Sequence, residues 1–205
     1  TCLKSLVNFN YSIVTNMRLN LFLVFFVGVL LSAKAQIIVQ SNATALQLAN
    51  KIVATSGTLG VGLSNALLTC DSLANGEFTG VSNLGISDGI VLSSGAVETD
   101  TPANYGLNGL PSTLATYALG TSGDVMLNGL VTPSITYDAC ILEFDIQPVG
   151  NFVEFEYVFG SEEYPEFNCS AFNDVFGFFI SGPGFATPTN IALVPSTTIP
   201  VSINS

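Results

Sequence analysis

The chain has 205 residues, of which 15 are acidic, 4 are basic and none is histidine, so its formal net charge is −11. Such an acidic chain is not expected to bind nucleic acid, because neutralising phosphates requires clustered Lys and Arg. Binding to an anionic membrane surface is disfavoured for the same reason. The lack of histidine excludes catalytic triads with a His base and argues against zinc sites of the usual type. We therefore predict that the chain is not an enzyme.

The N-terminal part has the layout of a secretory signal peptide. An unbroken apolar run, LFLVFFVGVLL at 21–31, follows Arg18 and precedes the small-residue motif Ala-Lys-Ala at 33–35. The run is shorter than the roughly 20 apolar residues that span a bilayer. The alternative is a buried core helix, but the position of the cleavage motif favours export.

Export divides the chain into three predicted parts. Met17 is the expected start of translation. The parts are upstream sequence at 1–16, a signal peptide at 17–35 and a mature domain at 36–205. The mature domain keeps one basic residue, Lys51, against all 15 acidic ones. Its length suffices for one domain with its own core. Its acidity suits a secreted or cell-surface protein.

One convincing helix is predicted near the start of the mature domain. Apolar residues recur with helical spacing over 45–54 (ALQLANKIVA). The polar residues at 41–44 can cap its N-terminus, and Gly57 and Gly60 end it. The later segment 98–134 is rich in Gly, Asn, Thr and Pro and is expected to form a long surface excursion.

The remaining elements are predicted to be short strands separated by Gly, Pro, Asn and Asp clusters. They are 61–69, 89–94, 138–146, 151–159, 174–181, 190–194 and 200–204. Many short strands with little helix indicate an all-β domain, and we expect a β-sandwich or jelly-roll-like fold with one short N-terminal helix.

Two of these strands are expected to pair as a hairpin. In both 140–146 and 151–159, apolar residues alternate with acidic ones, and a Gln-Pro-Val-Gly turn joins them. A register that keeps the apolar faces together sets Asp145 opposite Glu154. Like charges directly across an antiparallel pair are destabilising, so cations are expected to bind nearby.

Carboxylate and amide oxygens gather in the loop that follows 151–159. Ca²⁺ takes roughly six to eight oxygen ligands of this kind, so we expect a calcium site in the loop. Its expected ligands are Glu162, Glu163, Glu166, Asn173 and Asp174. One alternative is a solvated acidic loop, and another is a glycosidase with paired carboxylates. The lack of Trp, a common sugar-stacking residue, disfavours the glycosidase.

Cysteine usage fits an exported protein. After export, Cys70, Cys140 and Cys169 remain. Exported chains can form disulfides, but an odd number leaves one thiol free or paired with a cysteine beyond Ser205. The sequence leaves the pairing open. It contains no Cys-x-x-Cys motif, which argues against a zinc ribbon or a thioredoxin-like site.

One apparent catalytic motif fails on its context. The pattern Gly-x-Ser-x-Gly at 85–89 matches the nucleophile elbow of serine hydrolases. That elbow requires a following helix, whereas GIVLSS at 89–94 has the character of a strand. The histidine base is also missing, so we reject a serine hydrolase.

Several segments together resemble the choice-of-anchor L domain family of exported bacterial proteins. They are GISDGIVLSSGAV (85–97), YDACILEFDIQP (137–148), VFGSEEYPEF (158–167), FNDVFGFFISGPG (172–184), NIALVP (190–195) and PVSIN (200–204). The resemblance covers essentially the whole mature domain. The family name refers to variable C-terminal anchoring or sorting signals and implies no biochemical activity.

The resemblance implies a non-catalytic extracellular or cell-surface domain with a structural or adhesive role. Family members continue past the position of PVSIN with further strands, so an incomplete domain is expected, with an anchor or sorting region beyond residue 205. The expected partner is an extracellular protein or a glycan. The alternatives are a carbohydrate- or protein-binding module and a carboxylate-dependent hydrolase.

Overall fold

The computed structural model describes residues 37–55, 62–80, 84–97, 118–149, 153–161, 163–164, 167, 170 and 172–205. The predicted upstream sequence and signal peptide, residue Cys169 and the first part of the 98–134 excursion lie outside these ranges. No helix in the described ranges is long and apolar enough to cross a membrane.

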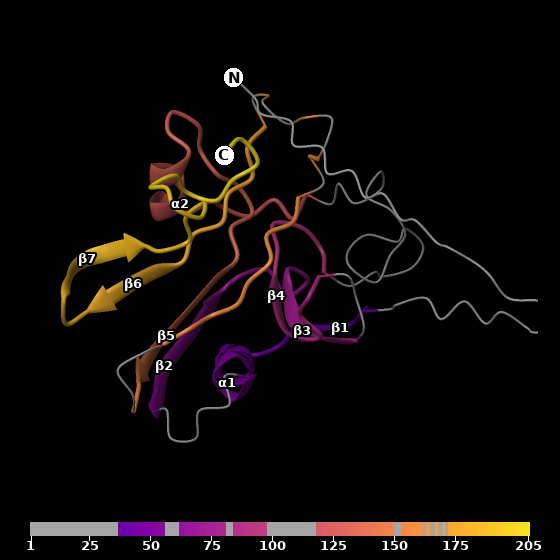
Figure 1. The fold of residues 1–205 in the computed structure, drawn as a ribbon. Coiled ribbons are helices and arrows are strands. Elements are labelled where there is room, and N and C mark those ends of the chain that lie inside the picture. Colours follow the sequence, from indigo (N-terminus) through magenta and orange to yellow (C-terminus); the bar gives the residue numbers. More distant parts are fainter. Residues whose placement is uncertain are drawn as a thin grey trace, which may run out of the picture. The chain divides into compact units, whose positions relative to one another are not determined.

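The described part of the chain is built mainly from antiparallel strands (Figure 1). In chain order the elements are β1 (Ile37–Ser41), α1 (Ala45–Thr55), β2 (Gly62–Thr69), β3 (Asn75–Gly80), β4 (Asp88–Leu92), α2 (Val125–Leu130), β5 (Ile141–Gln147), β6 (Phe179–Gly182) and β7 (Phe185–Asn190). They form a three-stranded sheet, β1-β3-β4, and the two pairs β2-β5 and β6-β7. The all-β prediction is confirmed, while the sandwich or jelly-roll arrangement stays a prediction.

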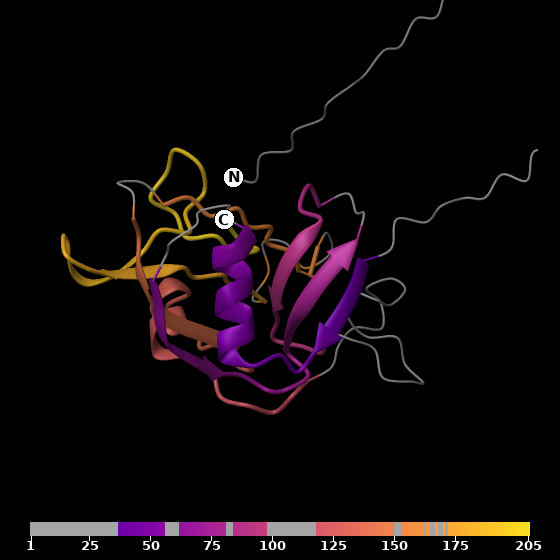
Figure 2. The same ribbon diagram turned by 90° about the horizontal axis from the view of Figure 1, so that it is seen from below.

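The predicted helix at 45–54 is confirmed as α1. Thr44 and Gln47 form a capping box at its start: the Thr44 N–H donates to Gln47 Oε1 at 2.9 Å, and the Gln47 N–H donates to Thr44 Oγ1 at 3.3 Å. Leu48 and Ala49 are fully buried. Figure 2 shows α1 between the β2-β5 pair and the three-stranded sheet, against both of which it packs.

The three-stranded sheet contains a small apolar core that joins Val39 of β1, Phe78 of β3 and Val97. Val39 and Phe78 are direct cross-strand partners. The sequence did not indicate β3, because its Gly-rich composition is typical of a turn. Gly76 is needed there: a side chain at this position would collide with the backbone carbonyl of Gln40 in β1.

A disulfide cross-links the β2-β5 pair. It joins Cys70, which follows β2, to Cys140, which precedes β5. Within the pair, Asn65 donates a hydrogen bond to Asp145 at 2.6 Å. The predicted hairpin of 140–146 with 151–159 is wrong, because β5 pairs only with β2 and the described part of the second run, 153–159, belongs to no sheet. Asp145 lies opposite Ser64, not opposite a second carboxylate.

Other elements also differ from the prediction. Residues 153–159 are in no sheet, and 191–194 and 200–204 contribute only isolated bridges, such as Leu193 with Pro200. The helix α2 lies inside the expected surface excursion. Its N-cap is Asp124, whose carboxylate accepts the N–H groups of Met126 and Leu127.

Candidate functional site

The acidic loop, residues 161–174, contains the predicted calcium ligands. The structure describes Glu163, Asn173 and Asp174, whereas Glu162 and Glu166 lie outside the described residues. The loop connects the run 153–160 to the segment that enters β6. Its two ends carry the described carboxylates, so their separation in space depends on how the loop closes.

Ser161 joins the two ends of the acidic loop. Its hydroxyl donates a hydrogen bond to Asp174 Oδ2 at 2.5 Å, and Ser161 Oγ in turn accepts a hydrogen bond from the N–H of Glu163 at 3.1 Å. A hydrogen bond to an ionised carboxylate is stronger than one between neutral groups. The serine therefore holds Asp174 near the start of the loop. The sequence offered no signal for this role.

The C-terminal turn supports the other arm of the loop. The Asn204 N–H donates to Asn173 Oδ1 at 3.1 Å, and Asn204 Nδ2 donates to the carbonyl of Ser170 at 3.0 Å. The N–H of Ile203, whose side chain is fully buried, donates to the carbonyl of Asp174 at 3.0 Å. Because Ile203 is anchored in the core, these bonds give the loop a fixed base.

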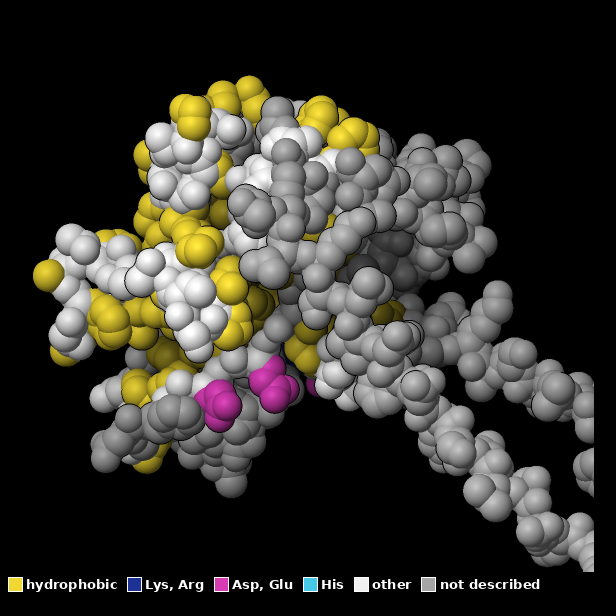
Figure 3. All heavy atoms as spheres, turned by 45° about the horizontal axis from the view of Figure 1, so that its top comes forward, with side chains coloured by type: hydrophobic (Ala, Val, Ile, Leu, Met, Phe, Trp, Pro, Cys, Tyr) yellow, Lys and Arg dark blue, Asp and Glu magenta, His cyan; other side chains and the backbone are white. Residues whose placement is uncertain are grey.

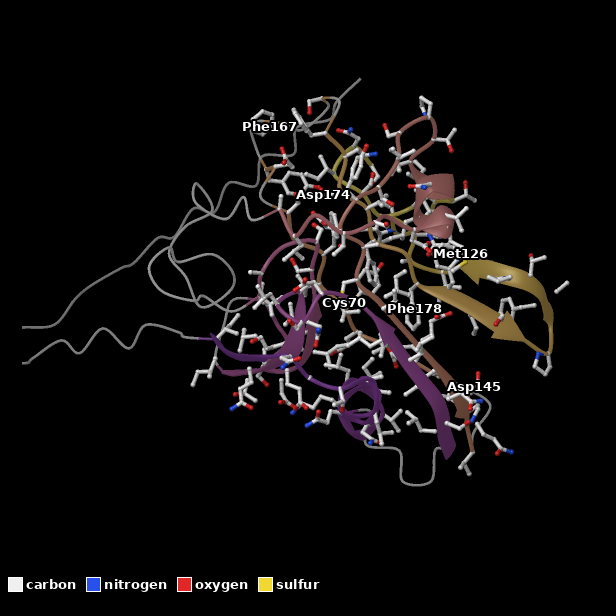
Figure 4. The ribbon with its side chains drawn as sticks, turned by 180° about the vertical axis from the view of Figure 1, so that it is seen from behind. Cys70, Met126, Asp145, Phe167, Asp174 and Phe178 are labelled. Carbon is white, nitrogen blue, oxygen red and sulfur yellow. A yellow bond between two sulfur atoms is a disulfide. The ribbon has the colours of Figure 1, made fainter. Side chains whose placement is uncertain are left out.

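Three aromatic residues lie along the acidic loop, and we call them the aromatic tip: Tyr164, Phe167 and Phe172. All three are exposed, Phe172 by 59%. The rings of Phe167 and Phe172 meet edge to face with centroids 5.3 Å apart. Figure 4 shows Phe167 at the outer end of the loop, with Asp174 nearer the body of the domain. The site thus combines an apolar tip with a polar, acidic base.

Some of the oxygen atoms predicted to bind calcium accept hydrogen bonds from protein groups. Asn173 Oδ1 and Asp174 Oδ2 each accept a hydrogen bond from the protein. Within the described ranges, no three His, Cys, Asp or Glu side chains form a group that could hold a metal ion. A calcium site here would need ligands from the residues outside those ranges, among them Glu162 and Glu166.

The single cation of the described residues is engaged elsewhere. Lys51 of α1 forms ion pairs with Asp88 of β4 at 2.6 Å and Glu77 of β3 at 3.7 Å. The hydrogen bond to Asp88 raises the pKa of the Lys51 amine, burial lowers it, and the charges of Asp88 and Glu77 raise it further. Figure 3 shows hydrophobic and acidic side chains on the visible face, and no described Lys or Arg.

The Gly-x-Ser-x-Gly pattern at 85–89 does not form a nucleophile elbow. It leads directly into strand β4, which begins at Asp88, so no helix follows the serine. Gly80 donates its N–H to the carbonyl of Ser87, which holds the segment as the connection between β3 and β4. The residues of this pattern therefore have a structural role in the three-stranded sheet.

These features define an antiparallel β domain with a loop that carries exposed aromatic side chains and carboxylates. Comparison with family models gives its class: the model of the choice-of-anchor L domain matches residues 37–205. The chain belongs to this family, whose domains are associated with exported surface proteins and are generally not enzymes. Comparison with curated proteins and with solved structures found no match in either set.

Proposed function

We propose that this domain has a structural or adhesive role outside the cell, and that the aromatic tip is its contact surface. The observation that carries the proposal is the exposure of Tyr164, Phe167 and Phe172 on one loop. Contiguous exposed apolar groups on soluble proteins mark interaction sites, and aromatic residues dominate the energetics of protein interfaces. The fixed base of the loop favours binding, because a preorganised surface loses less entropy on contact.

The proposal includes export through the signal peptide at 17–35 and an anchoring or sorting region beyond residue 205. Its partner is an extracellular protein or glycan. A dedicated carbohydrate- or protein-binding module is the first alternative, and the aromatic rings could serve it equally. The second alternative, a carboxylate-dependent hydrolase, would use Glu163 or Asp174.

Substitution of the aromatic tip should abolish adhesion without unfolding the domain. Beads coated with the protein are expected to attach to cells of the producing organism, and Phe172→Ser and Tyr164→Ser should each reduce attachment by roughly tenfold or more, as expected for an interface hot spot. Leu46→Ser is the matched control, because Leu46 is also exposed, by 56%, but lies on α1. Equal attachment by all three variants would refute the role of the tip.

We further propose that calcium binds at the base of the acidic loop. Asp174 and Glu163 support this proposal, because Ser161 contacts both residues. The carboxylates of Glu162 and Glu166, which lie outside the described residues, would complete an oxygen-rich ligand set of the kind that Ca²⁺ prefers. Binding there would stiffen the support beneath the aromatic tip.

Removal of calcium should lower the melting temperature of the domain. At a calcium concentration about 100 times the dissociation constant, binding to the folded state contributes about 2.7 kcal/mol. Melts with Ca²⁺ and with EDTA, at equal ionic strength, measure this difference. The variant Glu163→Gln/Asp174→Asn should lose it, and Glu143→Gln, on β5, should retain it. Equal stabilisation by Mg²⁺, or a calcium effect that survives in the double variant, would rule out the site.

A further inference from the structure

Residues 153–160, VEFEYVFG, have the composition of a strand but belong to none of the three sheets. We call them the unpaired segment. No described residue forms a hydrogen bond with a backbone N–H or C=O of this segment. A row of backbone groups left without protein partners is the feature by which a free strand edge accepts another chain.

Side chains, not backbone bonds, hold the unpaired segment in place. The ring of Phe155 contacts that of Phe178 with centroids 4.8 Å apart, and the ring of Tyr157 contacts that of Phe176 with centroids 4.9 Å apart. From Phe155 to Tyr157 the contact partner moves back from Phe178 to Phe176. The unpaired segment therefore runs antiparallel to residues 176–178. The aromatic contacts therefore fix the direction of the segment, while the described part of the chain leaves its backbone groups unpaired.

A shallow groove of about 410 Å³ runs beside the unpaired segment. One wall is formed by residues 155–158 and the other by Leu84, Gly85 and Ile86. Apart from its own chain neighbours, no heavy atom of the described residues lies within 4 Å of the position that a Cβ would take at Gly85, so this wall is open there to the described part of the chain. An extended chain in the groove would cover the exposed side chains of Tyr157 and Val158.

The negative charge of the unpaired segment determines which kind of polypeptide can bind beside it. Glu154 and Glu156 are both exposed, and the one described cation, Lys51, is engaged with Asp88 and Glu77. Opposite charges across neighbouring strands stabilise pairing, whereas like charges destabilise it. An incoming strand should therefore carry Lys or Arg beside these carboxylates and apolar residues at the alternate positions.

The same argument disfavours a second copy of this chain. Antiparallel pairing of two unpaired segments in the register that sets Val153 opposite Tyr157 also sets Glu154 opposite Glu156. Both like-charge pairs of that dimer would be destabilising. In this register, which sets each apolar residue opposite another apolar residue, the charges favour a different polypeptide segment as the occupant.

We propose that the unpaired segment accepts an extended polypeptide as an added β-strand, and that this polypeptide alternates basic with apolar side chains. Main-chain hydrogen bonds to residues 153–160 would supply affinity, and the groove with its two glutamates would supply selectivity. The proposal goes beyond the adhesive role, because the aromatic tip contributes no residue to this edge.

Hydrogen exchange with a defined peptide tests the proposal. The probe is a short synthetic peptide of alternating Lys and Val, compared with a Glu-Val peptide and with a block peptide of the same composition as the first. The amides of 153–160 should exchange rapidly in the protein alone and slow by roughly tenfold or more with the alternating Lys-Val peptide. The other two peptides should leave them unchanged.

Two variants separate backbone pairing from charge attraction. Val158→Pro removes an N–H from the edge and should abolish the protection, whereas Val125→Pro should not, because proline is tolerated at the first position of a helix. Glu156→Gln should weaken peptide binding, and Glu143→Gln should leave it unchanged.

Three results would overturn the proposal. One is slow exchange of 153–160 in the protein alone, which would mean that the chain already pairs this edge. Another is peptide binding without protection of these amides. The third is a dimer, detected by sedimentation, whose formation protects these amides, since the occupant would then be a second copy.

Discussion

Loss of the disulfide between Cys70 and Cys140 is expected to have the largest effect on stability. The two cysteines are 70 residues apart in the sequence. In the chain-entropy account, a cross-link closing a loop of this length stabilises the fold by about 4 kcal/mol, because it restricts the unfolded chain. Cys70→Ser/Cys140→Ser should therefore lower the free energy of unfolding in urea by about 4 kcal/mol, a large fraction of the roughly 5–15 kcal/mol that folded proteins have in total.

Chemical reduction provides the control for this prediction. A reducing agent should lower the stability of the wild type to that of the double variant and leave the double variant unchanged. A double variant as stable as the wild type would show that the β2-β5 pair does not depend on the cross-link. Peptide mapping by mass spectrometry would establish in the same samples that Cys70 and Cys140 are the bonded pair.

Truncation of Leu48 should be the second most costly change. Leu48 is fully buried on α1, which packs against strands of both the β2-β5 pair and the three-stranded sheet. Deleting buried methyl groups leaves a cavity, and Leu→Ala changes at such positions cost about 2–5 kcal/mol. Leu48→Ala is therefore expected to lower the urea midpoint sharply while leaving the slope of the transition unchanged.

The neighbouring Leu46 offers a matched control on the same helix. Its side chain is 56% exposed, so Leu46→Ala should change stability by no more than about 0.5 kcal/mol. The comparison keeps the substitution and the helix constant and varies burial alone. If both variants lost equal stability, α1 would not be the element that joins the two sheets.

The sequence predicts well those elements whose pattern is local. The helix α1 follows from apolar spacing and from the capping residues at 41–44, and β2 and β5 follow from runs bounded by turn residues. Pattern does not identify a strand's partner. Residues 153–159 alternate as a strand should, yet β5 pairs with β2, far away in the sequence and joined to it by the disulfide.

In the candidate site, too, the sequence predicts the local features and not the long-range contacts. Sequence composition located the acidic loop, because carboxylates are concentrated there. It could not reveal that Ser161 joins Asp174 to the backbone of Glu163, or that Asn204 supports the loop from the C-terminal turn. These contacts depend on long-range packing, and Ser and Asn carry no distinctive pattern that would predict them. The strand β3 escaped prediction for a related reason, since Gly76 serves a close approach of two backbones.

The most direct test of the central claim, a non-catalytic surface domain that acts by adhesion, follows binding and turnover in one experiment. The whole protein is incubated with arrays of glycans and extracellular proteins, and retained protein and released products are both measured. We expect retention that depends on Phe172 and no product above background. Product release that disappears in Glu163→Gln, with retention unaffected by Phe172→Ser, would contradict the account and establish a carboxylate-dependent hydrolase.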